Sequence, residues 1–132
     1  MRLLYDTNIV FDVIERRMPH YSASLQMHKL AQRGAVEGAL ASHTIANIFY
    51  QYQKAVIPDL RNRFLIDFEI VCGNADAVRT SLNRGFRDLE DALQVAAAVA
   101  WKAAFIITRN ERDFKLSPIP ALSPSAYLKR FH

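Results

Sequence analysis

Short apolar runs alternate with longer segments of helical periodicity along this chain, and that alternation constrains the fold more than any other feature. The runs at residues 2–5, 35–42, 70–73 and 104–108 have the length of buried strands, and a last short strand is expected within 119–131, before a C-terminal helix. Strands separated by helices pair in parallel through right-handed crossovers. The sequence therefore predicts a three-layer α/β/α sandwich with a central, mainly parallel sheet.

The segments between the apolar runs predict the helical layers. The first helix is expected over 7–16, and the second begins at Pro19 and ends at Gly34, with proline at its start and glycine just past its end. Helical spacing continues over 43–56, 59–69 and 75–84, with Pro58 separating the first two. The segment 89–103 is small and apolar on nearly every face, so its helix is expected between other layers. Residues 109–114 are expected to form a polar loop.

Length and composition indicate an ordinary globular chain. With 132 residues and no low-complexity tract, residues 1–132 are expected to form a single domain. The lone cysteine, Cys72, excludes an intramolecular disulfide. No apolar run approaches the ~18 residues of a membrane span, and Asp6 interrupts any signal-like segment, so a cytoplasmic protein is expected. The net charge of +4 fits a nucleic-acid partner without requiring one.

Four carboxylates stand where predicted elements begin or end. Asp6 follows the first strand, Asp88 and Asp91 open the apolar helix, and Asp113 follows the strand at 104–108. The carboxyl ends of parallel strands meet at one edge of the sheet, where ligands bind. Mg²⁺ and Mn²⁺ prefer hard oxygen ligands from separate elements. The sequence therefore predicts that Asp6, Asp91 and Asp113 converge on a divalent cation.

Each of these carboxylates also has a structural explanation, which the sequence leaves open. Asp6 can cap the helix that follows it or close an Asx turn. Asp88 and Asp91 have the spacing of a capping box and suit the helix dipole. Asp113 can pair with a neighbouring arginine in its loop.

Three stretches together resemble the PIN domain family. These are "LLYDTNIVFDVI" at 3–14, "DLEDALQVAAAVAWKAAFIITRNERDF" at 88–114, and the helices between them. The resemblance spans essentially the whole chain. It implies the fold of small prokaryotic toxin ribonucleases and other metal-dependent nucleases, whose acidic residues bind Mg²⁺ or Mn²⁺.

The resemblance also implies roles for individual residues. Asp6, Asp91 and Asp113 take the catalytic and metal-binding positions, and Asn47, within "HTIANIFYQ", takes the place of a usual glutamate. Asn47 leaves the site with one carboxylate fewer, while its amide oxygen remains a usable ligand. The residues expected to support the acids are Thr7, Asn8, Asn47, Asp88, Thr108 and Asn110. The residues expected to contact RNA phosphates are Arg84, Arg87, Arg109, Arg112 and Lys115.

The leading hypothesis is therefore a Mg²⁺- or Mn²⁺-dependent endoribonuclease, the toxin of a toxin–antitoxin pair, with RNA as substrate and a cognate antitoxin as partner. The alternative is a weakened PIN-like domain that binds RNA or a protein without cleavage. A phosphohydrolase with Asp6 as nucleophile is disfavoured because position 8 is asparagine rather than a second aspartate. A homodimer is expected through the apolar and aromatic segment 45–52.

Overall fold

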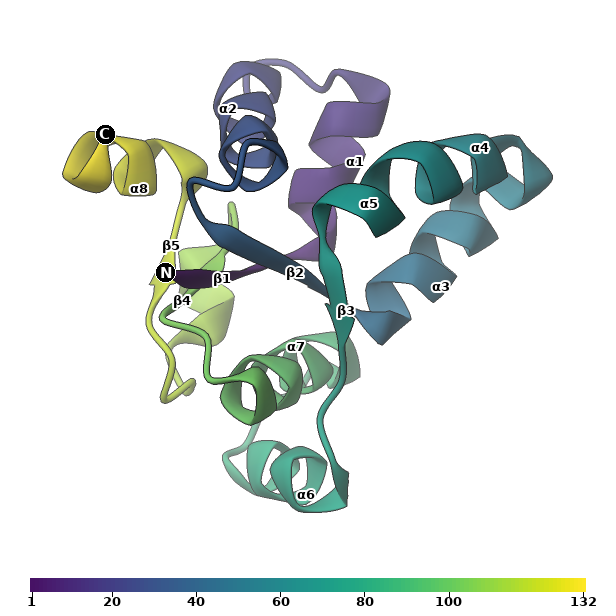
Figure 1. The fold of residues 1–132 in the computed structure, drawn as a ribbon. Coiled ribbons are helices and arrows are strands. Elements are labelled where there is room, and N and C mark those ends of the chain that lie inside the picture. Colours follow the sequence, from purple (N-terminus) through teal and green to yellow (C-terminus); the bar gives the residue numbers. More distant parts are fainter.

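Five parallel strands form one sheet in the order β3-β2-β1-β4-β5 in the computed structural model, which describes residues 1–132. The strands are β1 (Arg2–Tyr5), β2 (Glu37–Ala41), β3 (Glu69–Val71), β4 (Phe105–Ile107) and β5 (Ala121–Leu122). β1 is central, with Leu4 in register with Ala39 of β2 and Ile106 of β4. Helices cover both faces of the sheet (Figure 1). The predicted three-layer parallel architecture is confirmed.

The helices follow the predicted order, with two local differences. They are α1 (Thr7–Glu15), α2 (Tyr21–Gln32), α3 (Ser42–Tyr52), α6 (Ala75–Asn83), α7 (Leu89–Trp101) and α8 (Pro124–Phe131). The region expected to hold the helices 43–56 and 59–69 differs: the first helix ends at Tyr52, and residues 53–67 form a series of short turns. These are a 3₁₀ turn (Gln53–Val56), α4 (Ile57–Asp59), a π turn (Leu60–Phe64) and α5 (Leu65–Asp67). The expected polar loop contains a 3₁₀ turn (Glu111–Phe114), because Phe114 is buried. None of the helices is long and apolar enough to cross a membrane.

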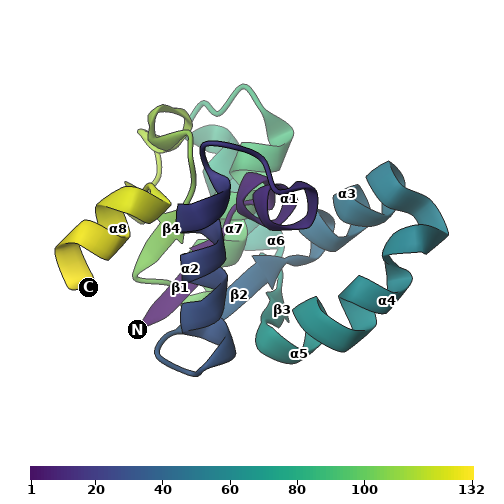
Figure 2. The same cartoon turned by 90° about the horizontal axis from the view of Figure 1, so that it is seen from above.

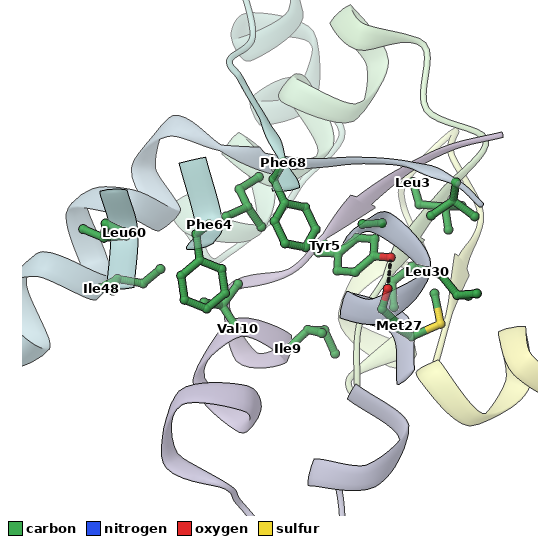
Figure 3. Packing of buried hydrophobic residues seen from close by; sticks show 14 of the residues in the cluster. Leu3, Tyr5, Ile9, Val10, Met27, Leu30, Ile48, Leu60, Phe64 and Phe68 are labelled. Carbon is green, nitrogen blue, oxygen red and sulfur yellow. Dashed lines mark hydrogen bonds between the residues drawn. The ribbon is translucent and has the colours of Figure 1, made fainter. Parts of the chain in front are cut away.

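The larger core lies on one face of the sheet, beneath α1, α2, the α3–α5 segment and α8 (Figure 1). Leu3 and Tyr5 point to this face, because side chains alternate along a strand. Tyr5 packs edge-on against Phe68 and donates its hydroxyl to the Met27 carbonyl oxygen at 2.6 Å (Figure 3). Phe64, which is fully buried, brings the turns after α3 back onto this core.

The opposite face is covered by α7, which lies between the sheet and α6 as predicted from its small apolar residues (Figure 1). Seen from above, α1 and α2 lie in front of the strands, and α6 and α7 lie behind them (Figure 2). Ala92, Val95 and Ala96 are fully buried. The chain before α6 also passes close to this helix: a Cβ built at Gly73 lies 2.6 Å from the Ala96 Cβ. Small residues on α7 thus allow close packing on two sides.

Candidate active site

One acidic cleft of about 360 Å³ opens at the carboxyl edge of the sheet. β1 ends at Tyr5 and delivers Asp6, the neighbouring β4 delivers the loop with Asp113, and the start of α7 delivers Asp91. The residues lining the cleft are Asp6, Thr7, Asn8, Phe11, Asn47, Tyr50, Gln51, Asp88, Glu90, Asp91, Asn110 and Asp113. The three acids proposed as metal ligands therefore line one cavity although they come from three separate segments.

Asp6 is held in place from three directions. Its Oδ1 accepts the Thr7 backbone N–H at 2.8 Å, which makes Asp6 the N-cap of α1, and also the Gln94 side-chain N–H at 3.2 Å. Its Oδ2 accepts the Thr108 hydroxyl at 2.8 Å. Asp6 is therefore both a cap and a cleft residue, so the two interpretations left open by the sequence are compatible.

The environment of Asp6 favours its protonated form. Burial is the main cause of a raised pKa, the bonds from Thr108 and Thr7 act in the opposite direction, and the nearby charges of Glu90 and Asp113 raise the pKa further. The negative charge of an ionised Asp6 is therefore unfavourable here, and either a proton or a bound cation would neutralise it.

A buried network beneath Asp6 links three segments of the chain. Gln94 is 1% exposed, and its amide N–H groups face Asp6 and the Thr7 and Thr44 hydroxyls, each at 3.2 Å. The two threonine hydroxyls also bond to each other at 2.8 Å. The Gln94 Oε1 is buried without a partner. This network fixes α1, α3 and α7 around the base of the cleft.

Asp88 and Asp91 have different surroundings at the start of α7. The Asp88 carboxylate is the N-cap and accepts the backbone N–H groups of Glu90 and Asp91 at 2.8 and 3.4 Å. Asp91 is half-buried, and burial together with the charges of Asp88, Asp6, Asp113 and Glu90 raises its pKa to about 7. The sequence interpretation of Asp88 as a cap agrees with this geometry, and Asp91 lies in the cleft.

Thr7 and Asn8 do not support Asp6 through the hydroxyl and amide bonds that their positions next to it in the sequence predict. Thr7 contributes its backbone N–H rather than its hydroxyl to Asp6, and Asn8 lines the cleft without a bond to Asp6. Asn110 lies at the rim, where its backbone N–H bonds to the Thr108 hydroxyl oxygen at 3.0 Å. Asp113 forms no ion pair, which excludes the arginine pairing left open by the sequence.

Asn47 lies in the cleft and faces Glu90, which the sequence did not single out. The Asn47 Nδ2 donates to the Glu90 Oε1 at 3.1 Å, across from α3 to the start of α7. Glu90 lines the cleft together with four aspartates. Its position next to Asp91 in the sequence was the only local signal for it.

The predicted phosphate-binding cations divide into two groups. Arg87, Arg112 and Lys115 line a second hollow that shares Asp88, Asp91 and Asp113 with the acidic cleft. The other two residues, Arg84 and Arg109, do not line that hollow.

Arg109 is held by a buried acid on α1. Its Nε lies 3.0 Å from the Asp12 Oδ2, and Asp12, fully buried, also accepts the Ser24 hydroxyl at 2.9 Å. Arg109 is therefore engaged in a structural ion pair, which sequence reasoning missed.

The donor set fits a hydrated divalent cation. The cleft combines five carboxylates, and no Lys or Arg forms an ion pair with any of them: Asp6, Asp88, Glu90, Asp91 and Asp113. As the side chains lie, no group of three or more His, Cys, Asp or Glu residues could hold a metal ion directly. Mg²⁺ usually keeps several waters and uses one or two carboxylates directly, which suits this open arrangement.

One family model matches most of this chain. The family model described as the PIN domain matches residues 2–112. The chain belongs to the PIN domain family. The match contains Asp6 and Asp91 and ends one residue before Asp113. No curated protein matches this PIN domain significantly.

Several solved structures share the fold of this PIN domain. VapBC2 from Rickettsia felis, bound to a DNA fragment from its promoter, is 24% identical with a TM-score of 0.68, covering 93% of this chain and 98% of that chain. A toxin–antitoxin complex from Klebsiella pneumoniae is 23% identical with a TM-score of 0.67, covering 92% and 97%. FitAcB from Neisseria gonorrhoeae is 14% identical with a TM-score of 0.70, covering 93% and 98%. At these identities the likeness establishes the fold.

Proposed function

We propose that this PIN domain is a Mg²⁺- or Mn²⁺-dependent endoribonuclease. The observation that carries the proposal is the cleft at the sheet edge, where Asp6, Asp91 and Asp113 gather without any cationic partner. Membership of a family whose general activity is metal-dependent nucleolysis supports the same reaction.

The aspartates would hold the cation, one or two of them directly and the others through bound water, and Glu90 lies beside them. When bound, the cation would polarise the scissile phosphodiester and activate a water for attack. Three hydrogen-bond donors hold the Asp6 carboxylate in one orientation. They are the Thr108 hydroxyl, the Gln94 side-chain N–H and the Thr7 backbone N–H. Such positioning by surrounding hydrogen bonds is what metal-binding carboxylates require.

The substrate is RNA, bound across the acidic cleft. Arg87, Arg112 and Lys115, in the adjoining hollow, are placed to contact backbone phosphates on one side of the scissile bond. Phe11 and Tyr50 line the cleft itself, and Tyr50 is 81% exposed. The cationic side therefore positions the backbone, while the aromatic side is open to bases.

The test is cleavage of a generic RNA by the purified chain with Mn²⁺ and with EDTA. We expect cleavage with Mn²⁺ only, and its loss in Asp6→Asn and Asp91→Asn, which keep the side-chain volume. Asp76→Asn is a matched control, since Asp76 is an exposed acid in the first turn of α6, outside the cleft. Cleavage in EDTA, or unchanged cleavage by Asp6→Asn, contradicts the proposal.

The second candidate is a PIN domain that binds RNA without cutting it. Asn47 favours this alternative, because an amide replaces the carboxylate implied at that position by resemblance to the family. The same assay separates the two functions. The second function is supported if RNA binds the protein in a filter-binding or gel-shift measurement and is not cleaved at any Mn²⁺ concentration.

We further propose that the chain is the toxin of a toxin–antitoxin pair, with the antitoxin as its protein partner. The support is the shared fold with VapBC2 and with the Klebsiella pneumoniae toxin–antitoxin complex. Induced expression of the chain in bacteria is expected to arrest growth, and expression of Asp6→Asn at the same level is not. Equal growth of both strains contradicts the toxin assignment.

The homodimer remains a prediction. Within the segment 45–52, Ile48 is fully buried, and Ile45 and Tyr52 pack against the core, which leaves Phe49 and Tyr50 as the exposed aromatic groups. A dimer through this face would need those two side chains. Light scattering at micromolar concentration is expected to give twice the chain mass, and a monomer mass removes the prediction.

A further inference from the structure

Glu90 occupies an unusual setting for an exposed glutamate. Its Oε1 accepts a hydrogen bond from the Asn47 Nδ2 at 3.1 Å, and it lines the cleft that contains Asp6, Asp91 and Asp113. The donor comes from α3, 43 residues earlier in the chain, so the bond spans the cleft between two helices. The Glu90 carboxylate is thus held at one place instead of extending freely into solvent.

The contact orients Glu90 without neutralising it. Two other exposed glutamates are paired with cations: Glu37 lies 3.0 Å from the Arg2 Nε, and Glu15 lies 2.6 Å from the Arg17 Nε. Glu69 and Glu111 form no ion pair, but neither lines the acidic cleft. The Asn47 amide is neutral, so this hydrogen bond brings no positive charge to Glu90, and no bond engages the Glu90 Oε2. A side chain used only to tie α3 to α7 would not need an uncompensated charge in a cleft that four aspartates also line.

We propose that Glu90 is a fourth carboxylate of the cation site and that Asn47 is the residue that positions it. The inference rests on the proposed function, since it assigns a residue to the same cation. The amide at position 47 then has a specific chemical reason: a carboxylate there would lie against Glu90 and repel it, whereas the amide donates a hydrogen bond. The negative charge on this side of the cleft then comes from Glu90 on α7, and residue 47 on α3 is neutral.

The amide and the carboxylate can be exchanged between positions 47 and 90, which leaves the number of carboxylates in the cleft unchanged. In the double variant Asn47→Glu/Glu90→Gln, the glutamine amide can donate to the new glutamate, so the bond is kept and the charge moves across the cleft. The single variant Glu90→Gln removes the charge and keeps the side-chain length. Glu111→Gln is the matched control, because Glu111 lies in the adjoining 3₁₀ turn outside the acidic cleft, and glutamine can still accept the Ser123 backbone N–H.

The experiment measures Mn²⁺ binding by electron paramagnetic resonance of the free ion, together with RNA cleavage, for the wild-type chain and the three variants. Circular dichroism verifies folding, which is expected because positions 47 and 90 are not in the core. We expect Glu90→Gln to weaken Mn²⁺ binding by about 10–100-fold, the range found when groups supporting a metal site are removed. The double variant should recover to within about threefold of wild type, and Glu111→Gln should remain unchanged.

The outcomes separate this inference from the proposed function. A wild-type chain that neither binds Mn²⁺ nor cleaves RNA overturns both. A wild-type chain that binds and cleaves, with Glu90→Gln equal to it, overturns only the role of Glu90. Loss in Glu90→Gln without recovery in the double variant overturns the positioning role of Asn47, because moving the charge across the same hydrogen bond is then not equivalent.

Discussion

Replacement of Asp91 by asparagine is expected to stabilise the metal-free protein at neutral pH. The folded-state pKa of Asp91 is about 7, against an ordinary value of 3.8, because of burial and four neighbouring carboxylates. At 1.36 kcal/mol per pH unit this difference corresponds to about 4 kcal/mol of unfavourable free energy when the group is ionised. Solvent screening of this partly exposed group reduces the value to about 1–2 kcal/mol. Loss of a helix-dipole contact removes roughly 0.5 kcal/mol, leaving about 1 kcal/mol net.

The sign of the pH dependence follows from the direction of the shift. Between about pH 4 and pH 7 the folded state of the wild type holds a proton on Asp91 that the unfolded state has lost, so its stability falls as the pH rises through this window. Asparagine does not ionise, so the Asp91→Asn variant does not lose stability as the pH rises through this window. The gain in the variant should therefore be absent near pH 4 and complete above pH 7.

The assay is urea unfolding in EDTA, followed by circular dichroism, at several pH values between 4 and 8. A gain of about 1 kcal/mol corresponds to a rise in the urea midpoint of roughly 0.3–1 M. The control is Asp76→Asn, an exposed acid in a helical first turn, which should change stability by less than about 0.5 kcal/mol at every pH. A less stable Asp91→Asn at pH 8, or a gain that does not vary with pH, refutes the reasoning.

Three further changes test the framework around the cleft, each by urea unfolding. Phe64→Ala should cost about 3–5 kcal/mol, because the ring is fully buried; a cost below about 1 kcal/mol contradicts its core role. Gly73→Ala should cost about 1–3 kcal/mol, since the new Cβ meets Ala96 at 2.6 Å, and a stabilised variant would show that α7 can move away. Gln94→Met should cost about 1–2 kcal/mol and reduce RNA cleavage by freeing Asp6; unchanged cleavage would separate this network from activity.

The sequence alone determined the architecture and the location of the cleft. Alternating apolar runs and helical segments are local patterns, and parallel strands place their carboxyl ends at one edge whatever their order. Asp6 and Asp88 were also predictable as caps, because the capping residue and its backbone donors are neighbours in sequence. The turns after α3 were less predictable, since residues 53–67 follow the buried positions of Phe64 and Phe68 rather than one helical period.

Only the tertiary structure decided which side chains meet within the cleft. Gln94 reaches Asp6 across 88 residues, and Asn47 reaches Glu90 across 43, through the packing of α7 and α3 around the end of β1. Arg109 likewise pairs with Asp12 instead of remaining free for phosphate. A sequence pattern records whether a position is polar and on which face it lies. The partner of a polar side chain depends on strand order, helix packing and side-chain direction, and these follow from the packing of the whole chain.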